Sequence, residues 1–92
     1  MAWIQARVLI EGRLQGINFR YQAQRQAQKL GLVGFVRHLS DGRIEIEMQG
    51  EKEEVDKMLA WCQEEPHSSQ IRSILFRYDE EPSRSYSEFS VR

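Results

Sequence analysis

Apolar and polar residues alternate along the first part of the chain, which is the pattern of a strand with one buried face. Between residues 3 and 10 the apolar side carries Ile4, Ala6, Val8 and Ile10. The alternation returns between residues 43 and 49, where Ile44, Ile46 and Met48 share one side. We predict further strands at residues 32–39 and 70–78, and a short last strand that contains Phe89 and Val91.

Two other segments place apolar residues three or four positions apart, which is the spacing of an amphipathic helix. In residues 19–30 these are Phe19, Ala23, Ala27 and Leu30, and in residues 51–64 they are Val55, Met58, Leu59 and Cys62. Asn18 is a natural N-cap for the first helix, and Gly31 is a natural stop.

The order of these elements predicts the fold. A tight turn at residues 40–42 makes a hairpin of the two middle strands, so the chain reads β-α-β-β-α-β with a short strand added at the end. This order is typical of the α+β class with the ferredoxin-like arrangement, an antiparallel sheet with two helices on one face. A chain of 92 residues with 40% apolar content suits one core, so we expect a single domain over residues 1–92. The fold alone does not identify a chemistry.

Charge and composition narrow the range of partners and compartments. Lys and Arg total 13 against 14 Asp and Glu, so the formal net charge is -1 and no excess of positive charge draws the protein to nucleic acid or anionic lipid. The sequence predicts neither a membrane span nor a secretion signal. A single cysteine, Cys62, cannot form an internal disulfide, which fits a reducing compartment. We expect a cytoplasmic monomer.

The loop between the first strand and the first helix is the strongest candidate for a ligand site. Gly12 and Gly16 allow backbone N–H groups to converge on an anion there. Arg20 lies in the first turn of the predicted helix, where the positive end of the helix dipole repels a cation unless an anion is bound. One interpretation is a phosphate cradle. The other is a surface turn in which Arg20 pairs with an Asp or a Glu.

Two segments resemble the signatures of a known family. Residues 12–20, GRLQGINFR, resemble the first acylphosphatase signature, Gly-x-Val-Gln-Gly-Val-x-Phe-Arg, with Leu14 and Ile17 as conservative replacements. Residues 34–44, GFVRHLSDGRI, resemble the second, in which Gly-aromatic-Val-Arg-Asn is followed by Asp-Gly-x-Val. The length, Gly50, Pro66 and the last four residues also fit, so the resemblance covers nearly the whole chain.

The resemblance implies hydrolysis of the carboxyl-phosphate bond of small acyl phosphates to carboxylate and inorganic phosphate, without a metal or a cofactor. The residues it implies for phosphate binding are Gln15, Gly16, Ile17, Asn18, Phe19 and Arg20, through their backbone amides and the Arg20 guanidinium. Donors aimed at a phosphoryl group are the main source of catalysis in such chemistry. The carboxylate leaves as a stable anion, so no strong general acid is needed.

The sequence departs from the family at one position, where His38 replaces an asparagine that orients the attacking water. A neutral histidine also offers one acceptor and one donor. A nearby phosphate dianion favours the imidazolium, which has no acceptor, so we expect phosphate binding to survive while turnover is reduced, most at acidic pH. We therefore assign catalytic roles to Arg20 and His38.

Other interpretations of these positions stay open. His38 could be a strand-end histidine without a role, and Gln15 or Asn18 could supply the missing carboxamide, although a helix cap is the favoured interpretation of Asn18. A catalytically weak module that binds phosphate, acyl phosphates or a protein partner is an alternative to the hydrolase. An RNA-binding module is a third class, because this fold carries aromatic platforms on its sheet, but the balanced charge argues against it.

The remaining reactive residues are interpreted as structural. Cys62 lies on the apolar stripe of the second helix, so we expect a buried thiol and not a nucleophile. His67 has no partner at metal-ligand or triad spacing and is interpreted as part of a loop. Glu45 and Glu47 alternate with apolar residues and so face away from them, as solvated charges or as cross-strand partners of Arg37.

Overall fold

The predicted order of elements is found in the structure, a computed structural model that describes residues 2–14, 18–64, 67–79 and 83–92. The elements are β1 (Trp3–Gly12), α1 (Phe19–Lys29), β2 (Val33–His38), β3 (Ile44–Glu51), α2 (Lys52–Cys62), the 3₁₀ turn η2 (His67–Gln70), β4 (Ile71–Asp79) and β5 (Phe89–Val91). The expected loop at residues 66–69 is therefore replaced, from His67 on, by a turn of 3₁₀ helix.

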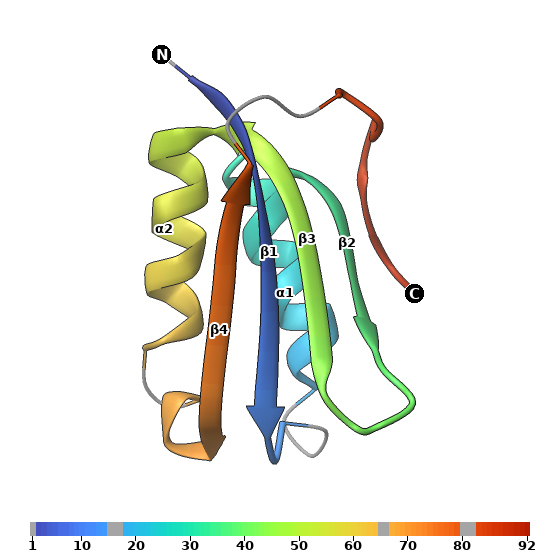
Figure 1. Cartoon of the computed structure of the whole chain (residues 1–92), viewed down its shortest axis with the longest axis vertical. Helices are drawn as coiled ribbons and strands as arrows, with labels where there is room; N and C mark the ends of the chain where they lie inside the picture. The colour runs from blue at the N-terminus through green and yellow to red at the C-terminus, as the bar shows by residue number, and fades with distance from the viewer. Residues whose placement is uncertain (1, 15–17, 65–66, 80–82) are drawn as a thin grey trace.

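One sheet with strand order β4-β1-β3-β2-β5 forms a layer, and both helices lie behind it in Figure 1. β1 pairs antiparallel with β3 and β4, and β2 pairs antiparallel with β3, which confirms the ferredoxin-like arrangement. The short strand β5 joins the edge of the sheet in parallel with β2, so the sheet is mixed. This parallel pairing follows from the path of the chain, which leaves β4 at one edge and returns at the other.

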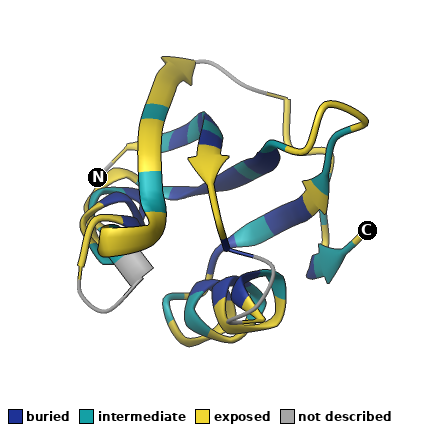
Figure 2. Ribbon diagram, turned by 90° about the horizontal axis from the view of Figure 1, so that it is seen from below, coloured by how far each residue is buried: buried dark blue, intermediate teal, exposed yellow. Residues whose placement is uncertain are grey.

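The core lies between the sheet and the two helices. Figure 2 shows buried residues on the strands and helices that border it. The strand residues predicted to face inward are all at most 3% exposed, and these are Ile4, Ala6, Val8, Ile10, Ile44, Ile46 and Met48. α2 adds its predicted stripe, and α1 adds Phe19, Ala23 and Ala27. The periodicity of the sequence therefore predicted the core face of each of these elements.

Two glycines explain how α1 ends and how β2 pairs. Gly31 has φ 72 and lies just past α1, where Leu32 N donates to Ala27 O at 2.9 Å and Gly31 N donates to Gln28 O at 3.1 Å. This is a Schellman motif, which confirms the predicted stop. Gly34 has φ 137, and a Cβ there would lie 1.9 Å from Glu47 O on β3, so no side chain fits.

Glu45 and Glu47 face away from the core, as predicted, but Glu45 is not solvated. Glu45 is only 2% exposed. Its carboxylate accepts hydrogen bonds from Arg7 Nε at 2.5 Å and from Arg37 Nε at 2.6 Å. The cross-strand partnership with Arg37 is therefore confirmed and the solvated interpretation of Glu45 is wrong, because arginines on both neighbouring strands cover the carboxylate. Glu47 accepts a hydrogen bond from the Tyr86 hydroxyl.

Candidate active site

A cavity of about 280 Å³ lies where the start of α1 meets the end of β2 and the start of β3. Its lining residues are Leu14, Asn18, Phe19, Arg20, His38 and Ile44. The fold thus brings together Arg20 from the first signature and His38 from the second, because β2 runs antiparallel to β3 and ends beside the helix start. Gln15, Gly16 and Ile17, which were also predicted to bind phosphate, lie outside the described residues.

The backbone at the start of α1 has the form of an anion-binding turn. Asn18 has φ 59 and ψ 40, a left-handed conformation, and helical residues follow it directly. A left-handed residue beside helical ones turns successive N–H groups to the same side, where they can surround an anion. The first turn of α1 carries no acidic side chain that would neutralise the positive end of the helix dipole. The local geometry and the dipole therefore both favour an anion at this helix end.

Asn18 does not cap the helix with its side chain, and that prediction is wrong. It occupies the N-cap position, but its side chain makes no capping hydrogen bond. A side chain caps best from an extended backbone, whereas Asn18 is left-handed. Asn and Asp tolerate this conformation better than other residues with a Cβ, so the asparagine at position 18 suits the left-handed backbone there.

Arg20 points its guanidinium towards the last strand. Its Nη1 donates to the backbone oxygen of Arg92 at 3.3 Å, and its Cζ lies 5.9 Å from the centroid of the Tyr21 ring. Among the described residues Arg20 forms no ion pair with an Asp or a Glu. The surface-turn interpretation, which needed such a pair, has no support in this part of the chain.

His38 faces the same cavity in a state suited to accepting a hydrogen bond. Burial and the positive charge of Arg20 hold the pKa of its imidazole below the ordinary value. Its Nε2 atom is buried and has no hydrogen-bond partner among the described residues. A bound phosphate favours the imidazolium. In the ligand-free protein the surroundings of His38 favour the neutral ring.

Two supporting residues were missed by the sequence argument. Gln24 Nε2 donates to Phe89 O at 3.1 Å, and Arg92 N donates to Val36 O at 2.8 Å, so β5 is held to both α1 and β2. These contacts use backbone oxygens, for which the sequence carries no signal. On the other side of α1, Phe19 stacks on Trp61 with ring centroids 5.4 Å apart.

The other candidate groups lie away from this cavity. Cys62 is buried, and desolvation raises the pKa of its thiol to about 12, so the prediction of an unreactive core thiol is confirmed. In the described part of the chain, no group of three or more His, Cys, Asp or Glu residues could hold a metal ion. No helix among those residues is long and apolar enough to cross a membrane.

Comparison with known proteins gives consistent results. Residues 6–91 match the family model described as Acylphosphatase. A protein of Roseiflexus sp. (strain RS-1) named Acylphosphatase is 38% identical over 91 residues, which is 99% of this chain and 97% of that protein. One from Methylococcus capsulatus with the same name is 40% identical over 84 residues, 91% of this chain and 90% of its own length.

Solved structures agree with these relatives. The crystal structure of an acylphosphatase from Bacillus subtilis has a TM-score of 0.86 at 28% identity and covers 97% of this chain and 98% of that one. The structure of an acylphosphatase from Coxiella burnetii has a TM-score of 0.83 at 28% identity and covers 99% of this chain and 94% of its own.

Proposed function

This chain belongs to the acylphosphatase family, and we propose that its hydrolysis of acyl phosphates takes place in the cavity between Arg20 and His38. The observation that carries the proposal is that these two residues, one from each signature, line a single cavity at the start of a helix. The reaction yields a carboxylate and inorganic phosphate.

The phosphate binds at the start of α1. The guanidinium of Arg20 holds two of its oxygens, because the planar fork of arginine matches a phosphate in a way that a lysine does not. The backbone amides of residues 15–20, including those of Asn18, Phe19 and Arg20, surround the remaining oxygens. This arrangement is supported by the left-handed Asn18 and by the absence of acidic side chains in the first turn of α1. These donors stabilise the phosphoryl group as its charge is redistributed in the transition state.

His38 takes the place of the family asparagine beside the attacking water. The water adds to phosphorus as the bond from phosphorus to the carboxylate oxygen breaks, and neutral His38 accepts a hydrogen bond from that water through a ring nitrogen. The lowered pKa of His38 and its unpartnered Nε2 support this role. A bound phosphate opposes this acceptor role of His38 because it favours the imidazolium. We therefore propose that turnover is lower than it would be with an asparagine at this position.

A second candidate function is a module that binds phosphate or acyl phosphates with little turnover. The presence of His38 in the cavity is the observation that favours it, because an imidazolium has two donors and no acceptor. Such a protein would bind inorganic phosphate about as well as an active relative does.

The hydrolysis of benzoyl phosphate by the unmodified protein and by Arg20→Ala separates these functions. We expect turnover by the unmodified protein and a loss of at least about a hundredfold in kcat/KM for Arg20→Ala, the size seen when one transition-state donor is removed. Arg25→Ala is the matched control, because Arg25 is an exposed arginine on the same helix. Inorganic phosphate is titrated in parallel. Phosphate binding without turnover selects the binding module.

We also propose that the protein works as a single-domain monomer in the cytoplasm, without nucleic acid partners. The formal net charge of -1 supports the last point, since nucleic acid binding draws on a positive surface. The single cysteine of the sequence, Cys62, is buried, which fits a compartment in which thiols stay reduced.

A further inference from the structure

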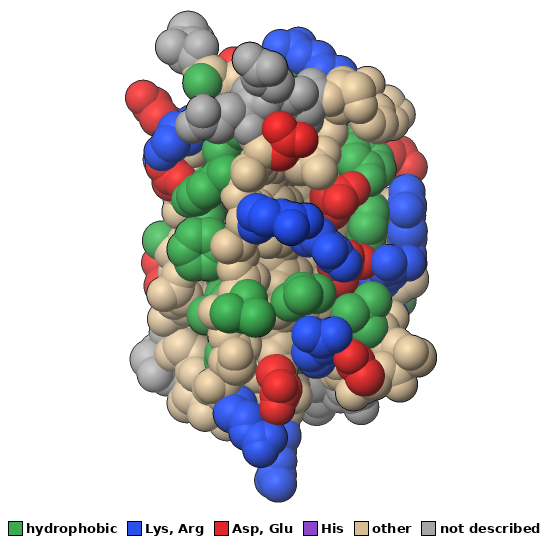
Figure 3. Space-filling model, in the orientation of Figure 1, with side chains coloured by type: hydrophobic (Ala, Val, Ile, Leu, Met, Phe, Trp, Pro, Cys, Tyr) green, Lys and Arg blue, Asp and Glu red, His purple; other side chains and the backbone are tan. Residues whose placement is uncertain are grey.

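Two arginines lie directly opposite each other on the sheet face that the helices leave uncovered. Arg7 on β1 and Arg77 on β4 are Cα partners in the antiparallel register, so their side chains share this face. Figure 3 looks onto the face and shows Lys and Arg side chains across its middle, with hydrophobic ones below them. Like charges in directly opposite positions destabilise a sheet unless an anion lies between them.

The two arginines differ in their contacts with the carboxylates nearby. Glu45 accepts hydrogen bonds from both Arg7 and Arg37, so one negative charge is shared by two guanidinium groups. Arg77 forms no ion pair with any of the described residues. The guanidinium of Arg77 is therefore not held in an ion pair by any residue in this part of the chain, although Glu47 and Asp79 line the hollow on one side of it.

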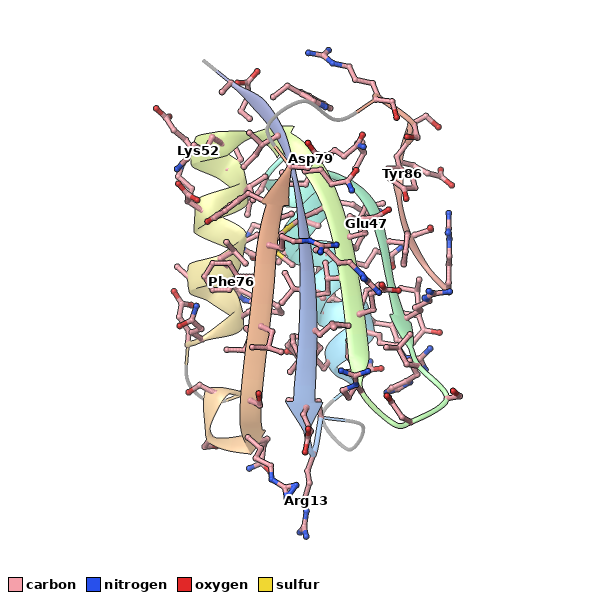
Figure 4. All side chains as sticks on the ribbon, viewed as in Figure 1. Arg13, Glu47, Lys52, Phe76, Asp79 and Tyr86 are labelled. Atoms are coloured by element: carbon pink, nitrogen blue, oxygen red, sulfur yellow. The ribbon has the colours of Figure 1, made fainter. Side chains whose placement is uncertain are left out.

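The larger hollow beside the pair is unfavourable for an anion. It measures about 560 Å³ and lies on the side of the arginines where Glu47 and Asp79 contribute to the lining. Figure 4 labels these two acidic residues towards the upper end of the sheet. Glu47 is engaged by the Tyr86 hydroxyl, whose pKa rises to about 12 through burial and this hydrogen bond. An anion placed here meets two carboxylates.

The smaller hollow on the other side of the pair has a different lining. It measures about 170 Å³ and is lined by Arg7, Leu9, Leu75, Phe76 and Arg77, with no acidic residue among them. Leu75 is 62% exposed and Phe76 is 47% exposed, so the lining of this hollow includes apolar surface that is open to solvent. An apolar cavity of about 150 Å³ in another protein binds benzene, so this hollow has room for one ring or a short chain.

We propose that this hollow binds an organic carboxylate. Its oxygens lie between the guanidinium groups of Arg7 and Arg77, and its apolar body covers Leu9 and Leu75. The arginines balance the charge of the head group, and burial of the body removes apolar surface from water. The site shares no lining residue with the cavity at Arg20. Its occupation does not depend on the proposed function, although carboxylates are also products of that reaction.

A titration of the full-length protein with benzoate, followed by amide chemical shifts in two-dimensional NMR, tests the proposal. We expect saturable shifts at Leu9, Leu75 and Arg77, and a dissociation constant about tenfold higher for Arg77→Gln, the cost of one charge-assisted hydrogen bond. Leu75→Ser should weaken binding as well, since it removes apolar contact. Arg72→Gln is the matched control: Arg72 lies on the same strand but is paired with Glu11 at 3.0 Å, and its loss should leave benzoate binding unchanged.

Three comparison ligands and a dilution series complete the test. Benzamide lacks the charge and inorganic phosphate lacks the apolar body, so both should bind at least about tenfold more weakly than benzoate. Acetate, with a minimal body, should fall between them and benzoate. Equal binding of benzamide or of phosphate overturns the proposal, as does an unchanged affinity in Arg77→Gln. The chemical shifts of these residues could instead depend on protein concentration and not on benzoate. That result would assign the face to contact with a second copy of the chain, and it would also overturn the proposal.

Discussion

Arg20 donates a hydrogen bond through Nη1 to the backbone oxygen of Arg92 at 3.3 Å. One turn further along α1, Gln24 donates to Phe89 O at 3.1 Å. These two side chains hold β5 against α1, while the backbone of Arg92 is bonded to β2. The orientation of the Arg20 guanidinium therefore depends on residues 89–92, which lie outside both signatures.

Replacing Gln24 tests this dependence. Gln24→Ala removes the bond to Phe89 O, so we expect the free energy of unfolding to fall by about 1 kcal/mol. KM for benzoyl phosphate should rise several-fold because Arg20 is held less firmly, with a smaller change in kcat. Gln28→Ala is the control, since Gln28 is an exposed glutamine on the same helix. An unchanged KM in a folded Gln24→Ala protein would show that Arg20 is positioned without β5.

The pH dependence of hydrolysis reports the charge of His38. The neutral ring is the active form in our proposal, and burial and Arg20 lower the pKa of His38 in the free protein. The acid limb of kcat/KM should therefore lie below the ordinary histidine value of about 6.5. The acid limb of kcat should lie at higher pH than the acid limb of kcat/KM, because the negative charge of the bound phosphate raises the pKa of His38 in the complex. Coincident limbs in the two profiles would contradict this coupling.

The same residue gives a stability prediction with a fixed sign. Because the pKa of His38 is lower in the folded protein than in the unfolded chain, the unfolded chain binds more protons in the pH range between the two values. The contribution of neutral His38 to stability is therefore complete above about pH 6.5 and is lost as the pH falls through the folded pKa. His38→Asn should remove this dependence from urea unfolding curves measured between pH 7 and pH 5.

His38→Asn introduces the asparagine that the resemblance of residues 34–44 to the second signature implies for this position. We expect a higher kcat than that of the unmodified protein, and a loss of the acid limb, because a carboxamide does not titrate and always offers an acceptor. The affinity for inorganic phosphate should change little, since Arg20 and the helix start are intact. Steady-state hydrolysis of benzoyl phosphate across pH measures all three. A rate that is unchanged or lower would show that His38 orients water as well as asparagine does.

Periodicity was enough to predict most of the fold. The inward-facing residues of β1 and β3 and the stripe of α2 were all placed correctly, because a buried face leaves a regular apolar pattern in the sequence. The parallel pairing of β5 with β2 was not predicted, since three residues carry no signal of direction. The burial of Glu45 was not predicted either. The alternation of residues in β3 shows only which side Glu45 faces, and the two arginines that cover it come from different strands.

The sequence predicted the residues that meet at the candidate site, but it did not predict the contacts that hold them in place. Signature spacing identified Arg20 and His38, and the structure places both in one cavity. Asn18 is at the predicted N-cap position, but its side chain makes no capping hydrogen bond, and the sequence could not show this because asparagine is favoured both as a side-chain cap and in left-handed turns. The lowered pKa of His38 depends on its burial and on its closeness to Arg20 in space, neither of which can be obtained from the sequence.

The buried carboxylate of Glu45 should contribute measurably to stability. Burial raises its pKa, but hydrogen bonds from Arg7 and Arg37 outweigh burial and hold the pKa below the ordinary value. We expect Glu45→Gln to lower the free energy of unfolding by about 2 kcal/mol at pH 7, because two guanidinium groups lose a charged partner. The difference should begin to shrink as the pH falls through the ordinary glutamate value of about 4.3, and it should vanish only below the lowered pKa of Glu45 in the folded protein.

Urea unfolding at pH 7 and pH 3 measures this difference, and Glu54→Gln is its control. Glu54 pairs with Lys57 at 3.1 Å on the surface of α2, where an ion pair contributes about 0.5 kcal/mol or less. If Glu45→Gln lowered the free energy of unfolding no more than Glu54→Gln does, the buried charge of Glu45 would make no larger net contribution to stability than a surface ion pair makes.

Variants of Asn18 separate a backbone role from a chemical one. In the left-handed conformation, alanine costs about 1 kcal/mol, whereas glycine adopts it without strain. If Asn18 serves to aim the backbone amides at phosphate, kcat/KM should fall less in Asn18→Gly than in Asn18→Ala, and the free energy of unfolding should follow the same order. If its carboxamide orients the attacking water in place of the family asparagine, both variants lose that group, and kcat should fall equally in both. Steady-state kinetics and urea unfolding of the two variants distinguish these outcomes, because only the backbone role ranks glycine above alanine.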